Sequence, residues 1–269
     1  MKRSSILPLI LLMLAGMGWL SSCEQEIELQ LENADSRVVI EGWITDDPGP
    51  YPIKVTRTSP YLGDGSDVVV SGALLILNDD QGAVDTLVEV RPGWYETTHI
   101  QGQMQHTYTL KVTVGDTTYT ASNYLPRINP IIGTGYEYND TLIFGAGYYC
   151  GLLALEPAGL GDFYQFRFTR NDTLFNSIQD LFVTNDDFVD GQVSPFLYPY
   201  PCQIGDTVVL EVRAISAASY DFYVTVAQQG TGAGGPFASV PDNLATNFDN
   251  GAFGWFGAAA TRKDTLAIQ

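Results

Sequence analysis

Hydrophobic and polar residues alternate with a period of two through much of the chain after residue 36. In residues 37–44 (RVVIEGWI), Val38 and Ile40 alternate with Val39 and Glu41. This period predicts β-strands that bury one face. Proline, glycine and aspartate separate the alternating segments, as in residues 46–50 (DDPGP), and these residue types favour turns.

Seven short strands are expected in the first half of the chain, which is typical of a β-sandwich. They are predicted at residues 37–44, 51–58, 68–77, 84–90, 93–97, 107–114 and 117–122. Residues 115–116 (Gly-Asp) predict a two-residue hairpin loop between the last two. The segment 126–130 (PRINP) predicts a domain boundary, because proline cannot extend a central strand.

A second β-rich region follows this boundary. Its strands are predicted at residues 141–144, 148–155, 163–169, 179–184, 207–215, 251–261 and 265–268. Residues 216–229 are predicted to form a helix capped by Ser216, although Phe222, Val224 and Val226 also fit a strand. We therefore expect an all-β fold of two sandwich-like domains, 37–127 and 128–269, with at most one short helix.

The first 22 residues have the pattern of a secretory leader: Lys2 and Arg3, an apolar run over 6–20, and small residues before Cys23. Residues 20–23 (LSSC) form a lipobox, which predicts cleavage before Cys23 and lipidation of its thiol. A transmembrane anchor is the weaker alternative, because a spanning helix needs about 20 apolar residues and this run is shorter and contains Pro8. We expect an outer-membrane protein attached to the membrane by its lipid.

Residues 23–36 are predicted to be an acidic tether. Acidic residues directly after a lipidated cysteine resemble the surface-export signals of Bacteroidota lipoproteins. We expect display on the cell surface, and orientation toward the periplasm stays open.

The chain carries 31 acidic and 13 basic residues, a net charge of −18. Such a surface repels phosphate backbones and anionic headgroups, so we expect no nucleic-acid partner and no membrane contact through a basic face.

Cys150 and Cys202 are the other two cysteines. In an oxidising compartment such a pair tends to form a disulfide, and two buried thiols are the alternative. The sequence contains no Cys-x-x-Cys motif, so we expect no zinc site.

Catalytic groups are sparse. His99 and His106 are the only histidines, and both are expected to be exposed loop residues without a nucleophile nearby. The paired aspartates 46–47, 79–80 and 186–187 are interpreted as turn formers. Residues 186–191 match part of a calcium loop, but other ligand positions carry Phe188 and Leu197, so a solvent-facing turn is favoured. We expect no enzymatic activity, no cofactor and no metal.

Aromatic residues are frequent, and most are expected in the core. Residues 195–201 (PFLYPYP) are the exception, because prolines were expected to hold their rings away from regular sheet. Phe196, Tyr198 and Tyr200 are therefore the predicted ligand-binding residues.

Four stretches resemble one Bacteroidota outer-membrane lipoprotein family, catalogued as domain of unknown function 4249. They are residues 23–29 with 37–51, residues 70–82, residues 186–192 with 205–223, and residues 235–258. The resemblance implies an N-terminal domain similar to immunoglobulin or transthyretin modules, and association with TonB-dependent receptor systems. It implies no known reaction.

The predicted function is therefore a non-enzymatic lipoprotein that serves a TonB-dependent receptor as an accessory or ligand-capture subunit. The alternative is a structural or adhesive envelope protein without a transported ligand.

Replacing Cys23 with alanine should abolish incorporation of labelled fatty acid, because the acyl chains depend on that thiol. Metabolic labelling followed by gel fluorography measures the effect. The Cys150→Ala variant is the matched control and should retain the full label. Equal labelling of the Cys23→Ala and wild-type proteins would contradict the predicted anchor.

Overall fold

The computed structural model describes residues 36–59, 66–231 and 244–269. The predicted leader, the predicted lipidation residue Cys23 and nearly all of the predicted tether lie outside these residues. The described chain consists mainly of strands, with one α-helix, α2 (Ala217–Thr231), and one 3-10 helix, η1 (Ile178–Asp180). The predicted all-β class is therefore confirmed. In the described part, no helix has the length and apolar composition needed to cross a bilayer.

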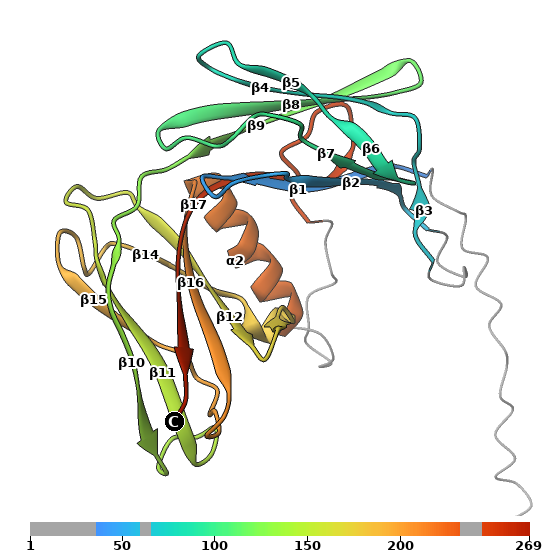
Figure 1. Ribbon diagram of the computed structural model, residues 1–269. Coiled ribbons are helices and arrows are strands. Elements are labelled where there is room, and N and C mark those ends of the chain that lie inside the picture. The colour runs from blue at the N-terminus through green and yellow to red at the C-terminus, as the bar shows by residue number, and fades with distance from the viewer. Residues whose placement is uncertain (1–35, 60–65, 232–243) are drawn as a thin grey trace, which may run out of the picture. The chain divides into compact units, whose positions relative to one another are not determined.

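The largest sheet of the described chain has ten strands (Figure 1). Its path runs β13–β12–β16–β17–β1–β2–β7–β6, with β14 paired to β12 and β3 paired to β2. The bounds are β1 (Val38–Thr45), β2 (Pro52–Arg57), β3 (Val68–Val69), β6 (Val88–Arg91), β7 (Trp94–Glu96), β12 (Phe163–Arg170), β13 (Thr173–Phe175), β14 (Phe182–Asn185), β16 (Thr207–Ile215) and β17 (Phe253–Ala267).

Two smaller sheets complete the described fold. A four-stranded sheet has the order β5–β4–β8–β9, and a three-stranded sheet has the order β10–β11–β15. Their bounds are β4 (Leu74–Asp79), β5 (Val84–Thr86), β8 (His106–Val114), β9 (Thr117–Leu125), β10 (Ile131–Asn139), β11 (Gly147–Leu155) and β15 (Val193–Leu197). The predicted Gly-Asp loop joins β8 to β9.

The alternating sequence of β1 produces the expected alternating burial. Val38, Ile40 and Ile44 are buried, whereas Glu41 is exposed. β1 pairs antiparallel with β2 on one side and parallel with β17 on the other. It is therefore an interior strand of the large sheet.

β17 connects the two predicted halves of the chain. It was predicted as two closing strands but is one continuous strand of 15 residues. Its first half pairs with β1 and its second half with β16. The predicted boundary at 126–130 is therefore wrong as a division of the structure, because one sheet contains strands from both 37–127 and 128–269. Residues 35–269 form a single compact unit.

The buried apolar residues also form one cluster across that boundary. It includes Ile53 of β2, Leu77 of β4, Leu152 of β11 and Leu210 of β16. A shared core of this kind makes the two β-rich regions depend on each other for burial.

The predicted helix is confirmed as α2, and the strand alternative for this segment is wrong. Ser216 caps it as expected, because its hydroxyl oxygen accepts a hydrogen bond from the amide of Ser219 at 3.2 Å. Rings of α2 pack on three different strands: Tyr220 on Phe163, Tyr223 on Trp43, and Phe222 on Trp255. These contacts decide in favour of the helix, since local β-propensity is a weak preference that packing can override.

Several strand predictions need correction. Residues 141–144 form bends and turns between β10 and β11, and residues 179–184 divide into η1 and the start of β14. The strands β10, β13 and β15 were not predicted. Glycines and mixed polarity hide the β10 pattern, and Pro195 lies inside β15.

Gly254 lies where β17 approaches β1 closely, so a substitution there tests whether the close approach contributes to stability. It has a φ of +97°, and a Cβ there would lie 2.8 Å from the carbonyl carbon of Ile40 and 2.9 Å from its nitrogen. We expect Gly254→Ala to lower the free energy of unfolding by about 2–4 kcal/mol, because it adds a backbone clash to the strain of a positive φ. Urea denaturation followed by circular dichroism measures this.

Gly72 provides the matched control. It also has a positive φ, +73°, but a Cβ there would meet nothing within 4 Å. Gly72→Ala should therefore cost only about 1 kcal/mol. Equal losses for the two variants would show that the close approach of β1 and β17 contributes nothing.

Candidate functional site

A row of polar side chains lies on one face of the large sheet, where β12, β16 and β17 run side by side. Register places Gln165 opposite Arg213 and Arg213 opposite Thr261; one step along, Arg167 faces Glu211 and Glu211 faces Lys263. Cross-strand partners project from the same face of a sheet. We call these six residues the polar row: Gln165, Arg167, Glu211, Arg213, Thr261 and Lys263.

Helix α2 lies over the same face as the polar row. Phe163 shares the β12 face with Gln165 and Arg167, and its ring packs on Tyr220 of α2. The opposite face of β12 packs on β15, where the Phe166 and Phe196 rings stack with centroids 3.7 Å apart. The sheet therefore has an apolar side toward β10–β11–β15 and a polar side toward α2.

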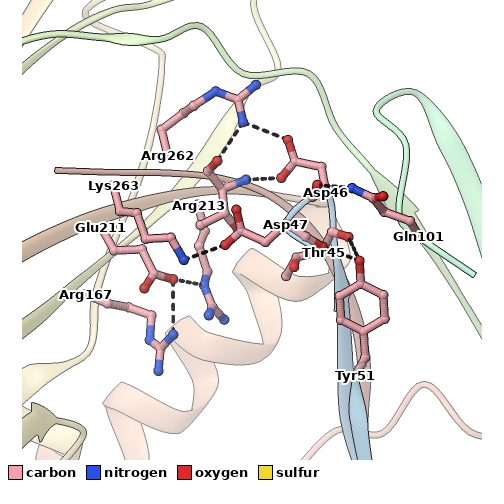
Figure 2. Close-up of polar contacts among 11 residues, drawn as sticks. Thr45, Asp46, Asp47, Tyr51, Gln101, Arg167, Glu211, Arg213, Arg262 and Lys263 are labelled. Atoms are coloured by element: carbon pink, nitrogen blue, oxygen red, sulfur yellow. Dashed lines mark hydrogen bonds and ion pairs between the residues drawn. The ribbon is translucent and has the colours of Figure 1, made fainter. Parts of the chain in front are cut away.

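Glu211 forms ion pairs with two arginines of the polar row (Figure 2). Its Oε1 accepts hydrogen bonds from Nη1 of Arg167, at 3.1 Å, and from Nε of Arg213. Burial opposes ionisation of Glu211, but Arg213 and then Arg167 outweigh it, so the pKa of Glu211 is lowered. Burial also lowers the pKa of Arg213. Two guanidinium groups thus share one carboxylate in a largely buried place.

The aspartate pair 46–47 follows β1 and fastens the neighbouring part of β17 (Figure 2). Asp46 accepts hydrogen bonds from the amide of Thr261 at 2.6 Å and from Nη1 of Arg262 at 2.7 Å. Asp47 pairs with Nζ of Lys263 at 2.6 Å. Both aspartates therefore connect the turn after β1 to β17, which is a structural role.

A cavity of about 290 Å³ lies between α2, η1 and the polar row. Its walls include Arg167, Arg213 and Gln165 from the sheet, and Asp180 from η1. Aromatic wall residues are Trp43, Phe166, Phe175 and Tyr223. Among the described residues, the buried Oε1 of Gln165 and Oγ1 of Thr261 have no hydrogen-bond partner. Buried polar atoms usually have a hydrogen-bond partner, so two unpartnered atoms in the polar row are unusual.

The predicted ligand-binding aromatics lie elsewhere than expected. Tyr198 is fully buried, and its hydroxyl donates to the carbonyls of Arg167 and Glu211. Phe196 stacks on Phe166, and the half-buried Tyr200 donates to a carboxylate oxygen of Asp180. The predicted exposed patch is therefore wrong, because Phe196 in β15 and Tyr198 and Tyr200 just after it pack their rings on the core aromatics Phe166 and Phe168. Each of the three touches a wall residue of the cavity: Phe196 touches Phe166, Tyr198 touches Arg167 and Tyr200 touches Asp180.

Cys150 and Cys202 come together as buried thiols, with the sulfur atoms 4.0 Å apart. The thiol of Cys150 and the nearby Arg170 lower the pKa of Cys202 to about 7. The hydrogen bond to Cys202 and burial raise the pKa of Cys150. The disulfide stays a prediction, and the structure supplies the proximity that it needs.

The two histidines have separate structural surroundings. His99 lies 3.3 Å from Asp85 and is exposed, as expected. His106 lies 3.0 Å from Asp80 and was also expected to be exposed, but it is half-buried at the start of β8. The structure does not bring either one to the polar row.

The segment considered as a calcium loop was expected to be a solvent-facing turn, but Asp186 is buried. Its carboxylate accepts the amides of Gly161 and Asp162. Carboxyl oxygens of Glu156, Asp186 and Asp190 lie within 4.8 Å of one another. Burial raises the pKa of Glu156, which bonds Tyr164 and the amide of Gly191. These carboxylates order loops, and no pattern in the sequence indicated that Glu156 joins them.

The outer side of the β10–β11–β15 sheet exposes a group of aliphatic side chains. We call it the apolar face: Leu153, Leu155, Val193 and Leu197, which are 43%, 41%, 52% and 54% exposed. Register sets Val193 opposite Leu155 and Leu197 opposite Gly151. A shallow groove runs past these residues over Gly133, Gly135 and Gly151, where no side chains fill the space. This face was not predicted, because β10 and β15 were not.

These features define an all-β protein with one helix over a charged sheet face. The chain belongs to the family described as "Domain of unknown function (DUF4249)", whose model matches residues 24–265. The resemblance to this family is therefore confirmed. No curated protein matches the chain. Among solved structures it is similar to the adhesin InvE of Yersinia pseudotuberculosis, at 16% identity and a TM-score of 0.21. That match covers 66% of this chain and 55% of the adhesin chain, and it is too distant to support an argument.

The cysteine pair gives a measurable prediction. Protein isolated from an oxidising compartment and then unfolded should show almost no reactive thiol at Cys150 and Cys202, because their sulfur atoms are already adjacent. Reduction should release two thiols and lower the free energy of unfolding by about 2–4 kcal/mol. A thiol-reactive dye and mass spectrometry count them.

The Cys202→Ser variant is the control and should show one reactive thiol before and after reduction. If the oxidised wild-type protein releases two thiols on unfolding without a reductant, the disulfide prediction is wrong.

Proposed function

We propose that this protein is a non-enzymatic, lipid-anchored outer-membrane protein that acts as an accessory or ligand-capture subunit of a TonB-dependent receptor system. The observation that carries the accessory role is the apolar face. Exposed apolar groups that lie together on a soluble surface are typical of protein–protein contact. The four side chains of this face are all aliphatic, although the chain has a net charge of −18, and Glu137 lines the groove beside them.

The proposed location of the protein rests on its sequence. The lipobox at 20–23 supports attachment through Cys23, and the acidic residues after it support display at the cell surface. Three acyl chains exceed the two membrane signals that stable anchoring requires. A body attached in this way stays beside outer-membrane receptors without crossing the bilayer.

The non-enzymatic role is supported by how the titratable groups are used. His99 and His106 pair with Asp85 and Asp80, and Glu156 and Asp186 bond loop amides and Tyr164. General acid–base catalysis needs a group within reach of a substrate proton, with a pKa near the working pH. Among these groups, His99, Glu156 and Asp186 act as structural hydrogen-bond partners, and His106 lies 3.0 Å from Asp80.

Membership of the receptor system rests on the family. The chain belongs to this family, and the likeness implied association with TonB-dependent receptors. The apolar face supplies a surface through which such a partner would bind. We take the occupant to be the receptor barrel.

The test is co-purification from native membranes. Wild-type protein with an affinity tag should recover a large β-barrel protein with a plug domain. The double variant Leu153→Ser/Leu197→Ser should reduce that recovery at least tenfold, since loss of two apolar groups from an interface costs about 2–4 kcal/mol. Quantitative mass spectrometry of the eluate measures the ratio.

The matched control is Val84→Ser/Val88→Ser, which removes two valines, 55% and 54% exposed, on β5 and β6. It should leave recovery unchanged. Recovery of the lipoprotein alone from wild-type membranes would overturn the accessory role. Binding of the purified protein to cells or matrix would then favour the adhesive alternative.

A further inference from the structure

We propose that the cavity between α2, η1 and the polar row binds a small carboxylate with a flat apolar body, with its carboxylate at Arg167 and Arg213. This inference rests on the proposed ligand-capture role for its biological use. The binding itself is a property of the purified protein.

The charge of the cavity's sheet wall favours an anion. Arg167 and Arg213 both use Glu211 as their partner, through a single carboxylate oxygen. Arg167 uses Nη1 and Arg213 uses Nε in these bonds, so further N–H groups of both guanidiniums remain for a ligand. The Arg213 side chain is only 16% exposed. A buried positive charge in excess of its partners is costly unless a counter-charge accompanies it.

Geometry also suits a carboxylate better than a point anion. A guanidinium group presents its donors in a planar fork that matches two carboxylate oxygens. Both arginines line the cavity. Burial disfavours the charged form of Arg213 and lowers its pKa, which a bound carboxylate would reverse.

Gln165 supplies the independent observation. Its side chain lines the cavity and is 7% exposed, and its Oε1 has no hydrogen-bond partner among the described residues. Gln165 and Tyr223 both line the cavity, and Gln165 lowers the pKa of Tyr223 against the larger effect of burial. The free acceptor is therefore held in the wall, where it would take a hydrogen bond from an amino or hydroxyl group of the ligand.

The remaining walls describe the rest of the ligand. Trp43 and Tyr223 present aromatic surface, which favours a flat apolar group. Asp180 is already an acceptor for Ser177 and Tyr200, and it keeps the η1 wall acidic. The volume of about 290 Å³ fits a molecule of amino-acid size.

Isothermal titration of the full mature protein in detergent tests the site, with 3-phenylpropionate as the probe. We expect one site per chain and an affinity at least tenfold above that for 3-phenylpropanol, the neutral alcohol of the same shape. L-phenylalanine serves as a second probe. If it binds more tightly than 3-phenylpropionate, its amino group is the donor to Oε1 of Gln165. Equal affinity for the acid and the alcohol would overturn the proposal.

Arg167→Gln should weaken 3-phenylpropionate binding at least tenfold. Lys263→Gln is the matched control, because Lys263 lies in the same polar row but pairs with Asp47 and does not line the cavity. It should bind as the wild type does. If both variants lose affinity equally, the net charge of the protein and not a contact with Arg167 is responsible for binding. The proposed site is then wrong.

Val226→Trp covers the case in which an arginine variant unfolds. Val226 lines the cavity from α2, and a larger ring there should fill the space and abolish binding while both arginines remain. Its near-ultraviolet circular dichroism and melting temperature report the fold. Retained affinity in a folded Val226→Trp protein, or no wild-type binding at 10 mM probe, would overturn the proposal. Either result leaves receptor co-purification unaffected, since that depends on the apolar face.

Discussion

The parallel pairing of β1 with β17 is the constraint on which the rest of the described structure depends. It joins the first strand of the sheet to the last, and so makes one sheet out of both halves of the chain. Two glycines permit it. Gly254 lies against the backbone of Ile40, and a Cβ at Gly257 would collide with the ring of Trp43. Because Trp43 lies over Gly257, its ring is available to stack on Tyr223 and set the position of α2.

That helix position explains why charged groups are buried on one sheet face. α2 covers Arg213 and Glu211, which sit in the middle of the sheet at β16. Removing these charges from water is expensive, and an apolar sheet face would be at least as stable. Their retention fits a recognition role better than a stabilising one. The position of α2 also separates the two surfaces. The polar row lies under α2, whereas the apolar face lies on the three-stranded sheet that packs against the other side of β12.

Much of the strand content was predictable, because a half-buried strand repeats every two residues whatever it pairs with. The sequence of β1 shows this plainly, and the hairpin between β8 and β9 follows from its Gly-Asp loop. β10 and β15 escaped prediction, since glycines and Pro195 interrupt their pattern. The burial of Tyr198 was missed for a similar reason: proline indicated irregular backbone, but Tyr198 directly follows the edge strand β15 and its amide still bonds the carbonyl of Cys150 in β11.

By itself the sequence determined the all-β class, the acidic charge and the family, because these depend on local pattern, composition and motif. It left helix and strand open for residues 216–229, which packing on Phe163, Trp43 and Trp255 decided. Tertiary structure alone decided the sheet order, the union of the two halves through β17, and the meeting of Arg167, Glu211 and Arg213. Strand pairing between distant segments depends on which faces can be buried together, and no local period contains that information. The alternating sequence of β12 indicates a strand, but it does not indicate which strand lies beside Arg167.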